Sequence, residues 1–250
     1  MADKESFADH FSTSSAGYSR YRPGYPAALF EYLAAQCSEH DAVWDCATGS
    51  GQAARELSPC FDLVLASDAS FEQVRNAEQK KNIFYLNNLA EQTPFIEHCL
   101  DLITVAQALH WFRLDSFYSE VRRLLKPGGV IAVWTYNLMQ VNPALDEVIW
   151  HLYAEVLGEY WPFERRLVEG GYRELDFPFA ERTPPPFAMQ SQWSVAHLVG
   201  YLSTWSAVKR YREAHGVDPV EKIYPALESA WGEEAMRTVH WPLSLRVGTV

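Results

Sequence analysis

The segment from Asp45 to Gly51 restricts the fold of this chain more than any other part of the sequence. It follows a short apolar run, Ala42–Cys46, and it precedes a helical pattern over Gln52–Leu57. Glycines in such a turn let the backbone bend tightly and approach a ligand closely. The following helix offers free N–H groups and the positive end of its dipole to that ligand. The segment therefore predicts a nucleoside-binding turn between a strand and a helix.

The rest of the first half alternates between apolar runs and helical patterns. Near-continuous apolarity, rather than strict alternation, indicates strands that are covered on both faces. Lys126-Pro127-Gly128-Gly129 is a strong stop signal for a helix. Alternation of this kind predicts an α/β fold with a doubly wound, mostly parallel sheet. We expect strands at Ala42–Cys46, Leu63–Ser67, Ile83–Leu86, Leu100–Val105 and Val130–Thr135, and helices at Pro26–Gln36, Gln52–Leu57, Phe71–Gln79 and Ser116–Leu125.

The chain after residue 140 has a different character. Helical patterns over Pro143–Leu157 and Val195–Tyr211 are separated by segments rich in proline and aromatic residues, and we expect a last strand over Val239–Val247. Aromatic excess of this kind marks a packed core more often than a pocket. We interpret residues 1–250 as a single domain. Its parts are an N-terminal flap and helix (1–40), a cofactor-binding core (41–136) and a helical, aromatic substrate cap with the last strands (137–250).

Charge and composition exclude several classes of protein. The formal net charge is −11 and no basic cluster is visible, so we expect no nucleic-acid partner. No apolar run reaches the roughly 20 residues of a membrane span, and the polar N-terminus lacks a signal-peptide core. We therefore expect a cytoplasmic monomer or homodimer. The cysteines show neither C-x-x-C pairing nor histidines at metal-ligand spacing, which predicts reduced thiols and no metal site: Cys37, Cys46, Cys60 and Cys99.

Taken alone, the turn fits two kinds of cofactor. Residues 49–54, Gly-Ser-Gly-Gln-Ala-Ala, satisfy the G-x-G-x-x-A dinucleotide pattern of an NAD(P)-dependent oxidoreductase. Asp68 ends the second predicted strand, where its carboxylate would accept hydrogen bonds from the ribose hydroxyls of either cofactor. Asp45 favours a cationic cofactor, because its carboxylate would repel a pyrophosphate. Structural roles remain open: Asp45 as a brace or N-cap of the turn, and Asp68 as the N-cap of the next helix.

Six segments, in this order along the chain, resemble a known family. They are Tyr18–Pro26, Asp45–Gly51, Ala66–Ser70, Ala90–Phe95, Asp101–Phe112 and Leu125–Gly129. Together they are similar to the class I S-adenosylmethionine-dependent methyltransferases of the type that includes trans-aconitate methyltransferase. The resemblance implies a Rossmann-like sheet of seven strands. The family usually has glycine at the position of Ala47, where we expect alanine to be accommodated with a negative φ.

The resemblance also implies which residues hold the cofactor. The turn would line its methionine part, the end of the second strand its ribose and adenine, and the segment after the third strand the other side of the adenine. The end of the fourth strand would lie beneath the sulfonium, and an N-terminal flap would pair Arg22 with the cofactor carboxylate. In chain order these residues are Tyr18, Arg22, Asp45, Ala47, Gly49, Gly51, Asp68, Ala69, Ser70, Ala90, Glu91, Ala106 and Gln107.

His110 and Trp111 carry the main prediction for the acceptor side. They follow the fourth strand, at the edge where open α/β sheets bind ligands. His110 is the candidate catalytic residue, as a base or as a hydrogen-bond donor, and Trp111 is a candidate wall of the methyl site or cation–π partner. The alternative is a helix-capping histidine beside a core tryptophan. Trp205, Arg210 and Tyr211 share one predicted helix and would offer an aromatic wall and positive charge to a substrate.

The sequence thus predicts methyl transfer from S-adenosylmethionine to a small molecule, with S-adenosylhomocysteine as the product. The expected acceptor is a carboxylate or another oxygen nucleophile. A carboxylate needs no general base, which otherwise contributes a factor of roughly 10²–10⁴. An NAD(P)-dependent oxidoreductase and a non-catalytic binding module remain as alternatives.

Overall fold

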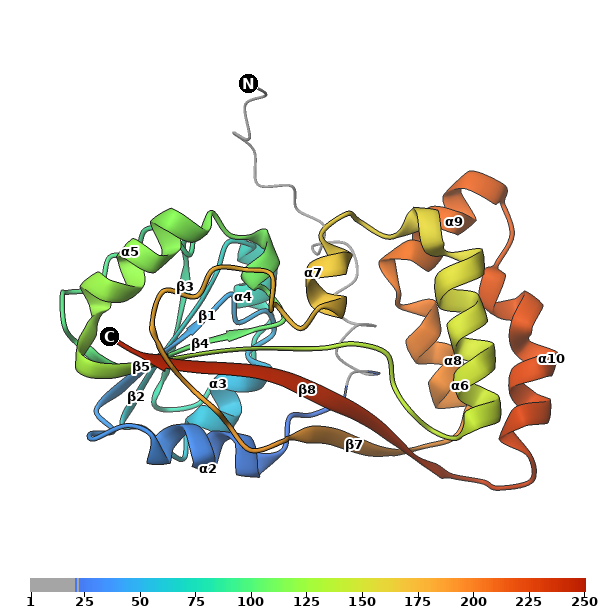
Figure 1. Ribbon diagram of the computed structural model, residues 1–250, viewed down its shortest axis with the longest axis horizontal. Coiled ribbons are helices and arrows are strands. Elements are labelled where there is room, and N and C mark those ends of the chain that lie inside the picture. The colour runs from blue at the N-terminus through green and yellow to red at the C-terminus, as the bar shows by residue number, and fades with distance from the viewer. Residues whose placement is uncertain (1–20, 22) are drawn as a thin grey trace.

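The computed structural model describes residues 21 and 23–250 and is built around one eight-stranded sheet (Figure 1). Seven strands lie in the order β3-β2-β1-β4-β5-β8-β6, in which β1 to β5 are parallel and β8 is antiparallel to β5 and β6. The predicted doubly wound sheet is confirmed. Its strands are β1 (Ala42–Cys46), β2 (Leu63–Asp68), β3 (Ile83–Asn87), β4 (Leu100–Ala106), β5 (Leu125–Tyr136), β6 (Ala180–Arg182) and β8 (Arg237–Thr249).

Helices cover both faces of the parallel strands, which explains their continuous apolarity. On one face, Val43 and Leu102 pack in a buried cluster with residues of α2 (Ala27–Ala35) and α3 (Gln52–Leu57). On the other face, Trp44 and Ile103 pack in a cluster with residues of α5 (Leu114–Leu124). Neighbouring residues of one strand thus enter opposite cores. The short helix α4 (Phe71–Arg75) contacts β2 and β3.

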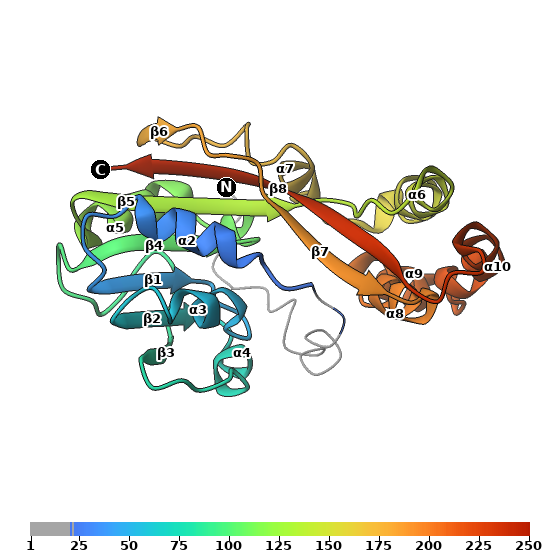
Figure 2. The same ribbon diagram turned by 90° about the horizontal axis from the view of Figure 1, so that it is seen from below.

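The second half forms a helical lobe with its own buried core. Figure 2 shows this lobe beyond the ends toward which β1 and β2 point. The long strand β8 connects lobe and sheet, because its first half pairs with β7 (Ala188–Trp193) and its second half pairs with β5. Trp193, Trp231 and Trp241 are buried in the lobe core, as the interpretation of the aromatic excess as core predicted. The lobe helices are α6 (Pro143–Trp150), the π-helix η2 (His151–Val156), α8 (Val195–Ser203), α9 (Ser206–His215) and α10 (Pro219–Trp231).

Several predicted helices have different bounds. The single helix expected over Val195–Tyr211 is wrong, because the chain breaks at Thr204 and Trp205. Trp205 takes an extended backbone there, and its side chain turns into the lobe core. The helix expected over Phe71–Gln79 ends at Arg75, and that over Pro143–Leu157 changes to π geometry after Trp150. The strands β6 and β7 and the helices α7 (Arg165–Glu169) and α10 were not predicted.

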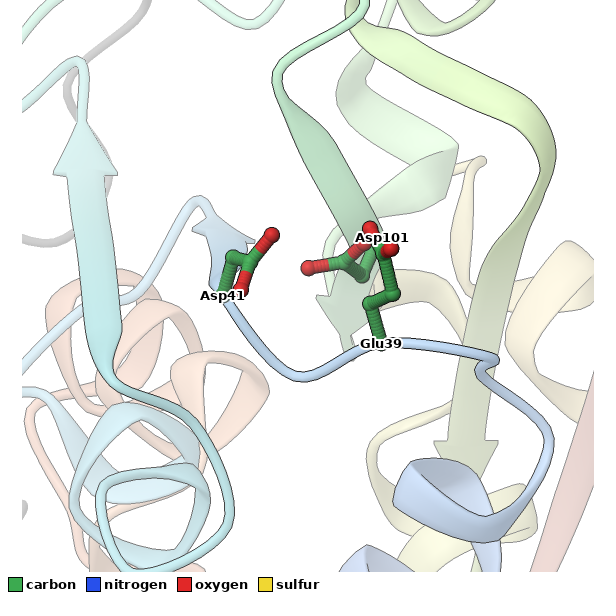
Figure 3. Close-up of side chains that lie close together, drawn as sticks. All are labelled: Glu39, Asp41 and Asp101. Carbon is green, nitrogen blue, oxygen red and sulfur yellow. The ribbon is translucent and has the colours of Figure 1, made fainter.

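Three carboxylates gather at the amino-terminal edge of the sheet, in an arrangement that could hold a metal ion (Figure 3). They belong to Glu39, Asp41 and Asp101, and the Lys126 ammonium contacts them at 2.8, 2.7 and 2.7 Å. Asp101 also accepts a hydrogen bond from the backbone N–H of Ala42. The cluster is therefore an ion-pair network that joins the starts of β1, β4 and β5. Among the residues that the structure describes, no helix is long and apolar enough to span a membrane.

Candidate active site

The carboxyl end of β1 is organised by a fully buried carboxylate. Asp45 accepts hydrogen bonds from the hydroxyls of Thr48, in the following turn, and Thr104, on β4, at 2.6 and 2.9 Å. Burial raises the pKa of Asp45 to about 6, and the two threonine hydrogen bonds oppose this rise. Asp45 thus braces the turn, and a cation placed near it would favour its ionised form.

Three residues of the turn have left-handed backbones. The φ angles of Ala47, Gly49 and Gly51 are 55°, 56° and 80°. The expectation of a negative φ at Ala47 is wrong, because Asp45 and a hydrogen bond from the N–H of Thr48 to Ser67 fix the turn in a shape that suits glycine.

The two glycines of the turn differ in their surroundings. A Cβ on Gly51 would lie 2.2 Å from the Tyr85 hydroxyl, so a side chain there would have to displace Tyr85, and the φ of 80° also favours glycine. A Cβ on Gly49 would meet nothing within 4 Å among the described residues. The backbone at Gly49 therefore borders open space that a ligand can enter.

Asp68 connects this turn to the end of β2. Its Oδ2 accepts from the backbone N–H of Gly49 at 2.9 Å, and its Oδ1 accepts from that of Ser70 at 2.8 Å. The Asn87 amide donates to the backbone carbonyls of Asp68 and Ala69 and so ties β3 to the same edge. The predicted Asp68, Ala69 and Ser70 therefore lie beside the turn. The N-cap position of α4 is Ser70, two residues after Asp68, so the alternative of Asp68 as the N-cap is wrong.

The segment after β3 brings Ala90 and Glu91 to this edge. Ala90 is buried, and Glu91 accepts a hydrogen bond from the backbone N–H of Arg113 at 2.9 Å. The Glu91 side chain therefore supports the start of α5 rather than extending into solvent. Sequence reasoning missed Asn88, whose buried Oδ1 has no hydrogen-bond partner among the described residues. Its position two residues before Ala90 was the available signal.

Gln107, which directly follows Ala106, joins the carboxyl ends of β4 and β5 by hydrogen bonds. Its Oε1 accepts from the Thr135 hydroxyl at 2.5 Å and from the backbone N–H of Tyr136 at 2.9 Å, and its Nε2 donates to the Tyr136 carbonyl. Its own φ is 57°. Sequence reasoning placed Ala106 and Gln107 correctly at the edge of the sheet, but the Gln107 side chain is directed toward β5.

His110 lies in η1 (Leu109–Trp111), next to the Trp111 ring at 4.7 Å. Burial and the charge of Arg165 lower the pKa of His110 to about 3, so its imidazole is neutral at neutral pH. Its Nδ1 lies 2.8 Å from the hydroxyl of the buried Tyr172, and burial raises the pKa of that phenol. The phenol oxygen also interacts with the side chain of Thr135 and with the backbone N–H groups of Leu109 and His110. This network fixes the orientation of the imidazole ring and leaves one ring nitrogen to donate and the other to accept a hydrogen bond.

Arg165 is the main residue that sequence reasoning missed. It begins α7, which Figure 1 shows between the sheet and the helical lobe. Its Nε donates to the Tyr153 hydroxyl at 2.7 Å, and its Nη2 donates at 2.9 Å to Asn137, which directly follows β5. The guanidinium lies 5.2 Å from the centroid of the Tyr153 ring and 5.0 Å from that of Trp161. Its only sequence signal is a position within an aromatic segment.

The remaining residues predicted for the substrate lie in two different places. The buried Trp205 packs 5.4 Å from Trp161 and so lies near Arg165. Arg210 and Tyr211 instead contact Tyr160 of η3 (Gly158–Tyr160), through a hydrogen bond to its carbonyl and through its ring. Their predicted substrate role stays a prediction. Tyr18 and Arg22 lie outside the described residues.

Comparison with known proteins decides the family. The methyltransferase domain family matches residues 44–133. A Dictyostelium discoideum protein assigned as a methyltransferase is 32% identical over 245 residues, which are 95% of this chain and 93% of that protein. This chain belongs to the class I S-adenosylmethionine-dependent methyltransferases. The predicted class of enzyme is confirmed, and the oxidoreductase alternative is set aside. The likeness to trans-aconitate methyltransferase stays a prediction.

Two further relatives agree with this family. The structure of an Anaeromyxobacter dehalogenans protein assigned as a type II methyltransferase superposes with a TM-score of 0.87 and 42% identity, over 91% of this chain and 97% of that one. A Saccharomyces cerevisiae protein assigned as an S-adenosylmethionine-dependent methyltransferase is 28% identical over 131 residues, 49% of this methyltransferase and 45% of its relative. The roles of individual residues stay predictions.

The strain at Ala47 gives a first prediction. Ala47→Gly should raise the free energy of unfolding by about 1 kcal/mol, because the left-handed strain of roughly 1–2 kcal/mol exceeds the entropic cost of glycine. Ala53→Gly, a buried position within α3, should instead lower it by about 1 kcal/mol. Urea denaturation of both variants measures the two effects. Loss of stability in both would show that the turn does not strain Ala47.

The raised pKa of Asp45 gives a prediction with a pH dependence. A carboxyl group whose pKa is higher in the folded state stabilises the fold at low pH, and that contribution is lost as pH rises from about 4 through about 6. Asp45→Asn removes this loss. In the cofactor-free methyltransferase, its stability relative to wild type should increase by about 2–3 kcal/mol between pH 4 and pH 7. Denaturation curves at several pH values test this, with the exposed Asp115→Asn as control; a pH-independent difference contradicts it.

Proposed function

We propose that this methyltransferase binds S-adenosylmethionine along the carboxyl edge of β1 to β4. We further propose that it methylates a carboxylate or another oxygen nucleophile of a small molecule. The observation that carries the donor site is the hydrogen bond between Asp68 and the Gly49 N–H, which holds a carboxylate at the rim of an open turn. Ribose hydroxyls are suitable donors to such a carboxylate.

The described residues fit this cofactor at several points. Open space beside Gly49 can admit its methionine part, and Asp45 supplies a negative charge for its cationic groups. The backbone around Ser70 and Ala90 borders the expected adenine position. The buried Oδ1 of Asn88, which has no donor among the described residues, can accept a hydrogen bond from an exocyclic amino group. Ala106 and Gln107 complete the edge beneath the sulfonium.

The low basicity of His110 bears on which acceptor the site suits. S-adenosylmethionine supplies an activated methyl carbon, which the acceptor oxygen bonds as the neutral thioether leaves. The protein holds the acceptor in line with that carbon and excludes water, and orientation alone can contribute about 7–11 kcal/mol. His110 is a weak general base, because its neutral imidazole takes up a proton only near pH 3. This arrangement favours a carboxylate, because its oxygen is already deprotonated.

The ribose assignment can be tested by substitution of Asp68. Asp68→Asn should weaken the binding of S-adenosylhomocysteine at least tenfold, because two charge-assisted hydrogen bonds lose their ionised acceptor. Isothermal titration measures the affinity. Asp62→Asn, an exposed carboxylate at the other end of β2, is the control and should bind like wild type.

Two outcomes would contradict the proposed function. Wild-type affinity in a correctly folded Asp68→Asn variant removes the ribose assignment. The acceptor is tested with methyl-labelled S-adenosylmethionine and matched pairs of carboxylates and amides. For these substrates, label is expected in base-labile methyl esters of the acids, and transfer to the amides but not to the acids would contradict an oxygen acceptor.

A further inference from the structure

A partly buried guanidinium without a carboxylate partner lies between the sheet edge and the helical lobe. Arg165 uses one N–H on Tyr153 and one on Asn137. Among the described residues, no ion pair includes Arg165 and its Nη1 has no hydrogen-bond partner. A guanidinium carries five N–H donors, so three remain for a ligand. The nearest carboxylate, that of Glu169, contacts Arg165 only through the Tyr153 hydroxyl. An anion bound at the unused N–H groups would therefore offset more of the cost of taking the cation partly out of water.

The surrounding residues fix the guanidinium in position. The rings of Tyr153 and Trp161 lie next to it, and the Trp161 indole donates to the Tyr153 carbonyl at 3.0 Å. Tyr153 belongs to the π-helix η2, a geometry that often marks functional positions. The carboxylate of Glu169 accepts the proton of the Tyr153 hydroxyl rather than pairing with Arg165. Because its orientation is set in advance, the guanidinium can bind a planar anion with little loss of conformational freedom.

Arg165 also lies near the acceptor side of the site. Asn137, which holds its Nη2, directly follows β5, and the neighbouring strand β4 leads to His110. The charge of Arg165 reaches the His110 imidazole, as its effect on the pKa of that group shows. The two residues therefore lie at the same end of the sheet. Trp161 and Trp205 provide apolar surface beside them.

We propose that Arg165 is the specificity-determining residue of the acceptor site, and that its unused N–H groups bind a carboxylate of the methyl acceptor. This inference rests on the proposed function and narrows it to small anionic acceptors. The fork of a guanidinium matches the two oxygens of a carboxylate, which distinguishes an acid from its amide. The neighbouring rings then contact the apolar or aromatic body of the same molecule.

The experiment compares Arg165→Gln with Arg166→Gln. Arg166 is the next residue of α7 but is exposed and stacks on Phe163 instead, so it is a matched control. Protein saturated with S-adenosylhomocysteine is titrated with succinate, benzoate and phenylacetate and with their amides. Tryptophan fluorescence reports binding, because Trp161 and Trp205 lie close to Arg165. For the tightest acid, Arg165→Gln should raise Kd at least tenfold and Arg166→Gln less than twofold.

The same titrations define the results that overturn the proposal. They are equal binding of acids and amides to wild type, equal acid binding to the two variants, and no saturable binding of any acid. Arg165→Lys keeps the charge but lacks the planar fork, so its Kd for the acid should lie between those of wild type and Arg165→Gln. If Arg165→Gln does not fold, Arg165→Lys replaces it in the comparison. S-adenosylhomocysteine affinity is measured in parallel. If wild type does not bind S-adenosylhomocysteine, the proposed donor site is refuted. If it binds S-adenosylhomocysteine normally but does not distinguish acids from amides, only the role proposed for Arg165 is refuted.

Discussion

The structure of the site depends on one buried carboxylate. Asp45 is enclosed at the end of β1 and joins the turn to β4 through the hydroxyls of Thr48 and Thr104. Burial of a charged group is unfavourable, and here it raises the pKa of the carboxyl to about 6. The hydrogen bonds hold a turn with three left-handed residues, and Asp68 then bonds to Gly49 within that turn. Burial of Asp45 thus lowers the stability of the fold, while its hydrogen bonds keep the carboxyl edge of the sheet fixed and open.

Two structural units meet at this edge, and each contributes a different kind of group. The sheet supplies carboxylates and small residues, which suit a cationic nucleoside cofactor. The segment from η2 to α7, between the sheet and the rest of the lobe, supplies a guanidinium and aromatic rings, which suit an anionic acceptor. The strand β8 runs through both units and pairs with β5 and β7, so that the lobe is held beyond the carboxyl ends of the parallel strands.

Local patterns predicted the parallel strands, the turn and Asp68, because each depends on neighbouring residues. The sign of φ at Ala47 was not predictable in this way, since a small side chain does not report the backbone that its surroundings impose. Trp205 interrupts an apparently continuous helical pattern because its ring is buried in the lobe. Arg165 was missed because Asn137, Tyr153 and Trp161 are brought to it by the tertiary fold, and no spacing in the sequence signals their contact.

The most direct test of this account is a crystal structure of the protein with S-adenosylhomocysteine. The account predicts that the ribose hydroxyls bond to Asp68 and that the open side of the sulfur faces the space between His110 and Arg165. A cofactor bound at the same edge with its sulfur directed away from Arg165 would contradict the proposed acceptor site. A ribose distant from Asp68 would contradict the account of the donor site.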